Sequence, residues 1–145
     1  MESCLFCKIA AGEIPSNKVY EDEYMLAFHD ISPMAKVHVL VIPKMHIANV
    51  DGITEENSEV IAKMFAKMGD IAKAAGITNG YRVISNCGAD AKQSVMHLHF
   101  HILGGQELPE KMASGLHPRR LRNKHSANIY ARSFRRSRAR GSWGA

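Results

Sequence analysis

Residues 97–103 of the chain read His-Leu-His-Phe-His-Ile-Leu, so that histidine and apolar side chains alternate along the segment. In a β-strand, alternate side chains point to the same face, and next-but-one neighbours lie about 7 Å apart. We therefore expect the three imidazoles to line one face of a strand, while Leu98, Phe100 and Ile102 enter the core from the other. Three side chains that titrate near neutrality contribute little to a purely structural strand, so the pattern predicts a functional site.

The chemistry open to such a row of imidazoles is limited. An imidazole can attack phosphorus as a nucleophile or bind a metal ion, and its neighbours can carry protons or stabilise developing charge. The sequence holds no glycine-rich phosphate loop, no Ser-His-Asp order and no His-Glu-x-x-His helix that would favour another chemistry.

The pattern of apolar and turn residues predicts a small α+β domain. Apolar residues recur at helical spacing from Ile61 to Ala75 and predict one main helix over 55–75. Thr54 is the expected N-cap of this helix, and Gly76 is expected to end it. Short apolar runs between turn residues predict strands at 18–20, 24–29, 37–42, 81–86 and 95–103. Several short strands around one helix are typical of a mostly antiparallel sheet, here of about five strands.

Length and charge divide the chain into a domain and a tail. Its 145 residues are 46% hydrophobic and 23% charged, which is typical of one globular domain. Residues 1–113 carry all 14 acidic residues and 10 of the 19 Lys and Arg, whereas residues 114–145 carry the other nine basic residues and no acidic one. Few aliphatic residues and no regular period in the tail predict disorder. We favour a solvated extension, and the alternative is a segment that binds nucleic acid through its phosphates.

The sequence favours a cytoplasmic protein. No apolar run approaches the roughly 18 residues of a membrane span, and Met1–Pro15 lacks the features of an export signal. Cys4 and Cys7 form a Cys-x-x-Cys pair, which in a reducing compartment indicates one half of a zinc site. Free thiols or a redox pair are the alternative. The third cysteine, Cys87, is interpreted as an ordinary loop thiol.

Four segments of the chain resemble the histidine triad (HIT) superfamily and its Hint branch. Residues 97–103 resemble the superfamily signature His-φ-His-φ-His-φ-φ, where φ is a hydrophobic residue. Phe-His-Asp-Ile-Ser-Pro at 28–33, Val-Ile-Pro-Lys-Met-His at 41–46 and Gln-Ser-Val at 93–95 resemble motifs of the branch. The resemblance covers about residues 4–113 and implies a HIT-like fold and a homodimer.

The resemblance implies a purine nucleoside phosphoramidase. Such enzymes hydrolyse adenosine 5′-phosphoramidates and aminoacyl adenylates to a nucleoside monophosphate through a nucleotidyl-histidine intermediate. His99 would be the nucleophile, and His38 would belong to the proton relay. His101 and the Ser94 hydroxyl would contact the phosphate or the leaving group. Covalent catalysis of this kind replaces one difficult displacement by two easier ones.

The resemblance also implies a nucleotide pocket formed by other residues. Asp30 would accept both ribose hydroxyls, a task that suits a carboxylate because it offers only acceptors. Ile31 would line the base pocket, Asn86 would position phosphate and ribose, and Gln93 would join Ser94 in the nucleotide-binding loop. The structural alternatives are a turn shaped by Asp30, a loop capped by Asn86 and a strand-edge hydroxyl at Ser94.

For the cysteine pair, the resemblance implies a complete metal site in which His46 and His97 join Cys4 and Cys7. A Cys2His2 set is closed, so the zinc would be structural and would tie the N-terminus to the histidine segment. A metal on His97 would also fix the tautomer of that imidazole beside the nucleophile.

The chain departs from the family pattern in two places. Ala91-Lys92 stands where the family loop has two glycines before Gln-Ser, and Leu108–Met112 replaces a Trp-Pro-Pro-Gly ending. Leaving-group selectivity is therefore not transferred. Two alternative functions stay open: a dinucleoside polyphosphate hydrolase or nucleotidylyl transferase of the same superfamily, and a nucleotide-binding scaffold whose basic tail engages nucleic acid.

Overall fold

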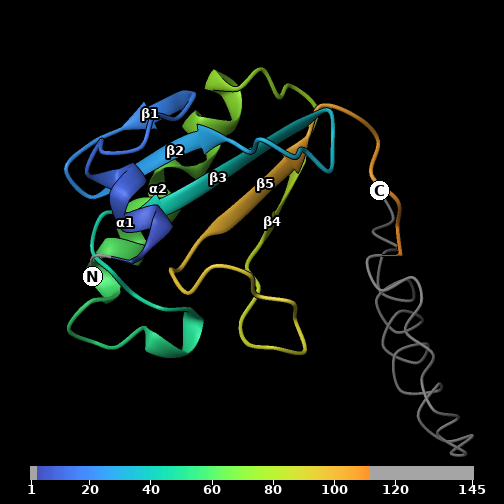
Figure 1. The fold of residues 1–145 in the computed structure, drawn as a ribbon. Helices are drawn as coiled ribbons and strands as arrows, with labels where there is room; N and C mark the ends of the chain where they lie inside the picture. Colours follow the sequence, from blue (N-terminus) through green and yellow to red (C-terminus); the bar gives the residue numbers. More distant parts are fainter. Residues whose placement is uncertain (1–2, 112–145) are drawn as a thin grey trace, which may run out of the picture. The chain divides into compact units, whose positions relative to one another are not determined.

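A computed structural model describes residues 3–111, which form a five-stranded antiparallel sheet with two helices (Figure 1). The spatial order of the strands is β1-β2-β3-β5-β4. Their bounds are Lys18–Glu21 for β1, Met25–His29 for β2, Val37–Pro43 for β3, Tyr81–Ile84 for β4 and Phe100–Gly104 for β5. The predicted α+β architecture, with about five antiparallel strands and one main helix, is confirmed.

The main helix, α2 (Ser58–Ala74), packs on one face of the sheet. Met64, Met68 and Ile71 recur at helical spacing and are buried against the alternate residues Val39 and Val41 of β3. The predicted start at residue 55 and the predicted N-cap Thr54 are wrong. Asn57 is the N-cap residue, and its side-chain oxygen accepts the Thr54 backbone N–H at 2.7 Å. That hydrogen bond belongs to a turn before the helix, so the helix starts at Ser58.

The opposite face of the sheet is covered by a short helix, α1 (Leu5–Ala10), that the sequence did not predict. Phe6 and Ile9 of this helix pack with Leu40 and Ile42, the β3 residues that alternate with those under α2. Both faces of β3 are therefore buried, which explains its uninterrupted apolar run. Six residues are too few to show a helical period. A single-turn 3-10 helix, η1 (Val50–Gly52), lies between β3 and α2.

The histidine-bearing strand is shorter than predicted. The predicted strand at 95–103 is wrong in its first half, because β5 begins only at Phe100. The preceding residues nevertheless keep the alternation: Leu98, Phe100 and Ile102 are buried in the core beneath α2. Strand β4 likewise ends at Ile84 and not at residue 86.

Within the described part of the chain, no helix is long and apolar enough to cross a membrane. The predicted tail, residues 114–145, lies outside the described residues.

We expect Gly105→Ala, just after β5, to destabilise the fold by about 1–3 kcal/mol. Gly105 has a φ of +78°, and a Cβ there would lie 2.8 Å from Val37 Cγ2. Gly69→Ala is the matched control, because a Cβ on this exposed position of α2 meets only the Tyr81 hydroxyl at 3.8 Å. It should stabilise by about 0.5–1 kcal/mol. Denaturant unfolding measures both changes, and equal effects would contradict the backbone argument.

Candidate active site and metal cluster

Three buried or half-buried imidazoles meet on the α1 side of the sheet, where β3 and β5 run side by side. The β3–β5 register places His38 opposite Leu103 and Leu40 opposite His101, so His38 and His101 are diagonal neighbours on one face. Their nitrogens, His38 Nε2 and His101 Nδ1, are 2.8 Å apart. The rings of His99 and His101 lie 5.0 Å apart between centroids. The structure thus brings together the three histidines predicted to be catalytic.

His99 is held with one ring nitrogen free. Its Nδ1 lies 2.7 Å from the His97 carbonyl oxygen, and because a carbonyl only accepts, Nδ1 must donate the proton. A neutral His99 therefore keeps its lone pair on Nε2. The rings of Phe6 and His99 pack nearly perpendicular to each other with 5.1 Å between centroids, and only 5% of His99 is exposed. These contacts hold the ring in place, with its free lone pair at Nε2.

His38 and His101 form a hydrogen-bonded pair with defined proton positions. The Met34 backbone N–H donates to His38 Nδ1 at 3.1 Å, so neutral His38 carries its proton on Nε2. That Nε2–H donates to His101 Nδ1, which places the proton of a neutral His101 on Nε2. His101 Nε2 is buried and has no hydrogen-bond partner among residues 3–111. The sequence did not indicate this contribution of Met34, because it comes from a backbone amide in a loop.

The electrostatic surroundings keep this pair uncharged at neutral pH. Burial, reinforced by the neighbouring His99 and His38, lowers the pKa of His101 to about 4. Burial also lowers the pKa of His38, although the Asp30 carboxylate opposes that shift from 3.5 Å. Both shifts favour the neutral imidazole. At pH 7 both imidazoles are therefore neutral, and the Nε2–H of His101 is the donor that is left without a partner within residues 3–111.

A pH dependence of stability follows from His101. Its pKa is about 4 in the folded chain and about 6.5 in an unfolded one, so the unfolded chain binds more protons between these values. We expect stability to be fully present above about pH 6.5 and to fall progressively as the pH drops towards 4. In His101→Gln, the free energy of unfolding measured in urea should depend less on pH than in the wild type between about pH 4 and 6.5. Identical slopes would show that His101 does not titrate as described.

Apart from the histidines, the predicted nucleotide-binding residues lie in two loops, one after β2 and the other between β4 and β5. Asp30, directly after β2, accepts the Ser32 N–H on Oδ1 at 2.8 Å and places Oδ2 beside His38. The turn-shaping alternative for Asp30 is therefore present in the structure. Ile31 is fully exposed, and Asn86 is half-buried two residues beyond β4. The ribose, base and phosphate contacts of these residues stay predictions.

Gln93 holds its loop through its own side chain. The Gln93 amide donates to the carbonyl oxygens of Ala48 and Val95, and it accepts from the Gly88 N–H and the Asn49 side chain. These four hydrogen bonds stabilise the loop, while the contact of Gln93 with a nucleotide stays a prediction. Ser94, the next residue, is exposed. Lys92 has a φ of +61°, the conformation that favours the glycine of the family pattern, so this loop carries local strain.

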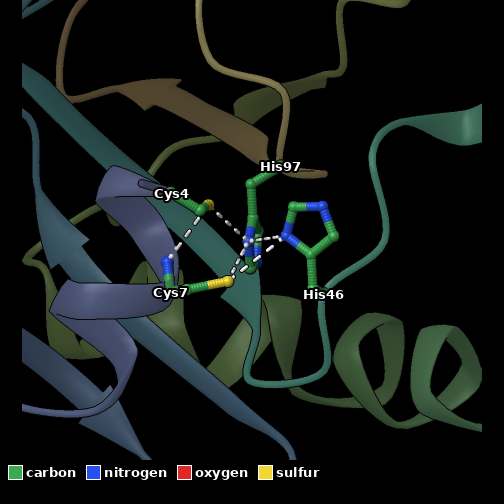
Figure 2. A group of neighbouring side chains, drawn as sticks. All are labelled: Cys4, Cys7, His46 and His97. Carbon is green, nitrogen blue, oxygen red and sulfur yellow. Dashed lines mark hydrogen bonds between the residues drawn. The ribbon is translucent and has the colours of Figure 1, made fainter. Parts of the chain in front are cut away.

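A separate cluster brings Cys4, Cys7, His46 and His97 together, as Figure 2 shows. The cysteines come from the start of α1, His46 follows β3, and His97 precedes β5. Cys7 Sγ lies 3.2 Å from His46 Nδ1 and 3.4 Å from His97 Nδ1, and the two imidazole nitrogens are 3.2 Å apart. The ligand atoms of all four residues lie within 4.8 Å of one another. The structure assembles the four residues that were predicted to bind metal.

The donor set of this cluster fits a metal ion. His97 Nε2 donates to the Pro43 carbonyl oxygen at 2.8 Å, so its Nδ1 carries a bare lone pair. That lone pair faces both sulfurs and the His46 nitrogen, and it cannot accept hydrogen bonds from all three at once. Zinc–ligand bond lengths place tetrahedral ligand atoms about 3.3–3.6 Å apart for nitrogen–nitrogen and nitrogen–sulfur pairs. The observed separations of 3.2–3.4 Å lie within about 0.4 Å of that geometry, so the cluster can hold a metal such as zinc.

Comparisons with known proteins agree with the fold and the histidine pattern. The model of the HIT domain family matches residues 11–108. Protein HitA of Neisseria gonorrhoeae is 46% identical over 104 residues, which cover 72% of this chain and 97% of that protein. A HIT family hydrolase from Clostridium thermocellum superposes with a TM-score of 0.74 and 48% identity over 77% of this chain and 98% of its own. A HIT family hydrolase from Legionella pneumophila superposes with a TM-score of 0.71 and 43% identity, over 74% of this chain and 97% of its own.

Proposed function

The chain belongs to the HIT domain family, and on this premise we propose that it hydrolyses the P–N bond of purine nucleoside 5′-phosphoramidates, and aminoacyl adenylates as well. The observation that carries the proposal is the state of His99. Its Nδ1–H is bound to the His97 carbonyl oxygen at 2.7 Å, which leaves the Nε2 lone pair free for attack on phosphorus. Two relatives of known structure are HIT family hydrolases, which favours hydrolysis over binding alone.

For a phosphoramidate, the reaction proceeds in two displacements at phosphorus; with an aminoacyl adenylate, the bond that breaks is P–O and the leaving group is the amino acid carboxylate. In the first, His99 Nε2 forms a bond to phosphorus, the P–N bond of the substrate breaks, and the amine leaves with one proton taken from solvent. The Ser94 hydroxyl, which is exposed, contacts the phosphate or the leaving group in this proposal. In the second, water attacks phosphorus, the bond to Nε2 breaks, and the lone pair returns to His99 while one water proton passes to solvent. The products are the amine and a nucleoside monophosphate.

The remaining histidines and Asp30 serve the nucleotide. His101 presents its buried Nε2–H to the phosphoryl group, and His38 orients it from the far side. Asp30 accepts the ribose hydroxyls, since each carboxylate oxygen has two lone pairs and the Ser32 N–H uses only one of them. Ile31 lies against the base, and Asn86 and the loop of Gln93 and Ser94 face the ribose and the phosphate.

The metal in this proposal is a structural zinc held by Cys4, Cys7, His46 and His97. When bound, it supplies cross-linking between α1 and the segment that leads into β5. His97 is both a ligand of this cluster and the residue whose carbonyl oxygen orients His99. The cluster is closed by four protein ligands and leaves no position for substrate. Its role is to hold the nucleophile in place.

The working form in this proposal is a homodimer. Strand β4 lies at an edge of the sheet, and an edge strand presents unpaired backbone groups that a second copy can pair. Two exposed aromatic side chains favour an interface here: Tyr81 on β4 is 39% exposed, and Phe65 on α2 is 49% exposed. Light scattering of the purified protein at several concentrations measures the assembly. A monomer at every concentration would refute this part.

Mass spectrometry of a quenched reaction tests the proposed reaction. We expect an adenosine phosphoramidate to leave a nucleotidyl group on His99 when turnover is stopped early. The matched substrate is diadenosine triphosphate at the same concentration. Faster cleavage of diadenosine triphosphate would replace the proposal with a dinucleoside polyphosphate hydrolase. Nucleotide binding without turnover of either compound would leave a nucleotide-binding scaffold.

A further inference from the structure

We propose that the backbone amide of Met34, acting through His38, sets the tautomer of His101, so that the buried imidazole presents its Nε2–H to the phosphoryl oxygen of the substrate as a neutral donor. Met34 is thus a positioning residue that acts through His38. The inference rests on the proposed function for the identity of the acceptor. The proton positions themselves follow from hydrogen bonds within the chain.

The argument begins at the Met34 amide, which can only donate. Because it donates to His38 Nδ1 at 3.1 Å, that nitrogen has to be unprotonated. His38 then holds its single proton on Nε2, between two acceptors: His101 Nδ1 at 2.8 Å and Asp30 Oδ2 at 3.5 Å. His101 is left with its proton on Nε2. One backbone amide therefore fixes the tautomers of two histidines.

The same contacts exclude a second proton from the pair. An imidazolium carries protons on both nitrogens. A charged His38 would turn an N–H towards the Met34 N–H, and a charged His101 would turn an N–H towards the His38 N–H across 2.8 Å. Each protonation thus replaces a hydrogen bond by two opposed donors. Burial acts in the same direction, since the pKa of each of these two imidazoles is lowered.

A neutral donor is the useful state for a phosphoryl site. The His101 Nε2–H is buried without an acceptor among residues 3–111, and an unpaired buried donor is costly unless a ligand completes it. A preorganised N–H aimed at a developing negative charge stabilises the transition state without proton transfer.

The grouping of Asp30, His38 and His101 also resembles a metal site. Its His38 Nε2 carries a proton, however, and so offers no lone pair to a metal.

Nitrogen-15 NMR of the histidine side chains in the wild-type protein tests the proton positions without reference to turnover. We expect both His38 and His101 to be protonated on Nε2 alone at neutral pH. Adding adenosine 5′-monophosphate should leave His101 neutral while its Nε2–H resonance shifts. A protonated Nδ1 on His101, or an imidazolium in the complex with the nucleotide, would overturn the inference and leave the proposed reaction standing. If the spectrum is as expected but the protein does not hydrolyse phosphoramidates, the inferred tautomers stand and the proposed reaction is wrong.

Substitution of Met34 tests the cause. Met34→Pro removes the N–H, whereas Met34→Ala keeps it, and the exposed side chain makes the alanine variant a matched control. We expect the proline variant to show mixed His38 tautomers and a kcat roughly three- to tenfold lower, with KM little changed. The alanine variant keeps the amide and should show the His38 tautomer of the wild type. Equal spectra for the two variants would show that the amide does not set the tautomer.

Two substitutions of His101 separate a neutral donor from a general acid. Gln at this position keeps an N–H donor and an acceptor for the His38 N–H but cannot deliver a proton, whereas Leu removes both. We expect His101→Leu to lose on the order of 100- to 1,000-fold in kcat, as for a single oxyanion donor. His101→Gln should retain at least about ten times the activity of the leucine variant. Equal losses would identify His101 as a proton donor and refute the neutral role.

Discussion

His99→Ala is expected to abolish phosphoramidate hydrolysis while adenosine 5′-monophosphate still binds. Loss of a covalent nucleophile lowers kcat by roughly four to six orders of magnitude in hydrolases that work through a covalent intermediate. Binding should survive because His99 supplies the attacking nitrogen, while His101 and Asp30 make the proposed contacts to phosphate and ribose. Steady-state kinetics and isothermal titration calorimetry measure the two effects separately.

The control for this variant is His29→Ala. His29 ends β2, and the β2–β3 register pairs it with Val39, so its side chain lies on the α2 face of the sheet, opposite to His38. It should keep near wild-type activity. Because His99 is buried beside Phe6, metal content and circular dichroism have to be unchanged in His99→Ala before its kinetics are interpreted. A folded, metal-loaded His99→Ala that turns over normally would remove His99 as the nucleophile.

The sequence was sufficient for the grouping of side chains but not for their proton positions. Alternation of histidine with Leu98, Phe100 and Ile102 specified which side chains are buried beneath α2, and the structure confirms that separation. The tautomers depend on three backbone groups: the carbonyls of His97 and Pro43 and the amide of Met34. Every residue type except proline carries a backbone N–H, so no residue identity could indicate that these groups would be aimed at imidazoles.

Two of the errors in the predicted elements, the missed helix α1 and the late start of β5, have a common physical origin. Helix α1 is too short to form alone, and it is stabilised by packing of Phe6 and Ile9 on the sheet and by Cys4, whose sulfur accepts the Cys7 N–H. Similarly, the segment before Phe100 leaves the sheet while His97 joins the cysteine cluster. Tertiary contacts decided both cases, and such contacts do not appear in local periodicity.

Replacement of a cluster cysteine is expected to cause a large loss of stability. Cys7→Ser should reduce bound zinc from about one ion per chain to nearly none, because a closed four-ligand site depends on every ligand. A metal present at a thousand times its Kd contributes about 4 kcal/mol to the folded state. For a domain of this size we expect a fall in Tm on the order of 15–20 °C, measured by thermal unfolding beside elemental analysis.

Cys87→Ser is the matched control for that measurement, because Cys87 lies outside the cluster. It should keep both the zinc and the Tm. A chelator should lower the Tm of the wild type and of Cys87→Ser to the level of Cys7→Ser, while leaving Cys7→Ser unchanged. Because the His97 carbonyl oxygen orients His99, metal loss should also reduce kcat before the domain unfolds. A metal-free native protein with the same Tm would instead identify Cys4 and Cys7 as free thiols or a redox pair.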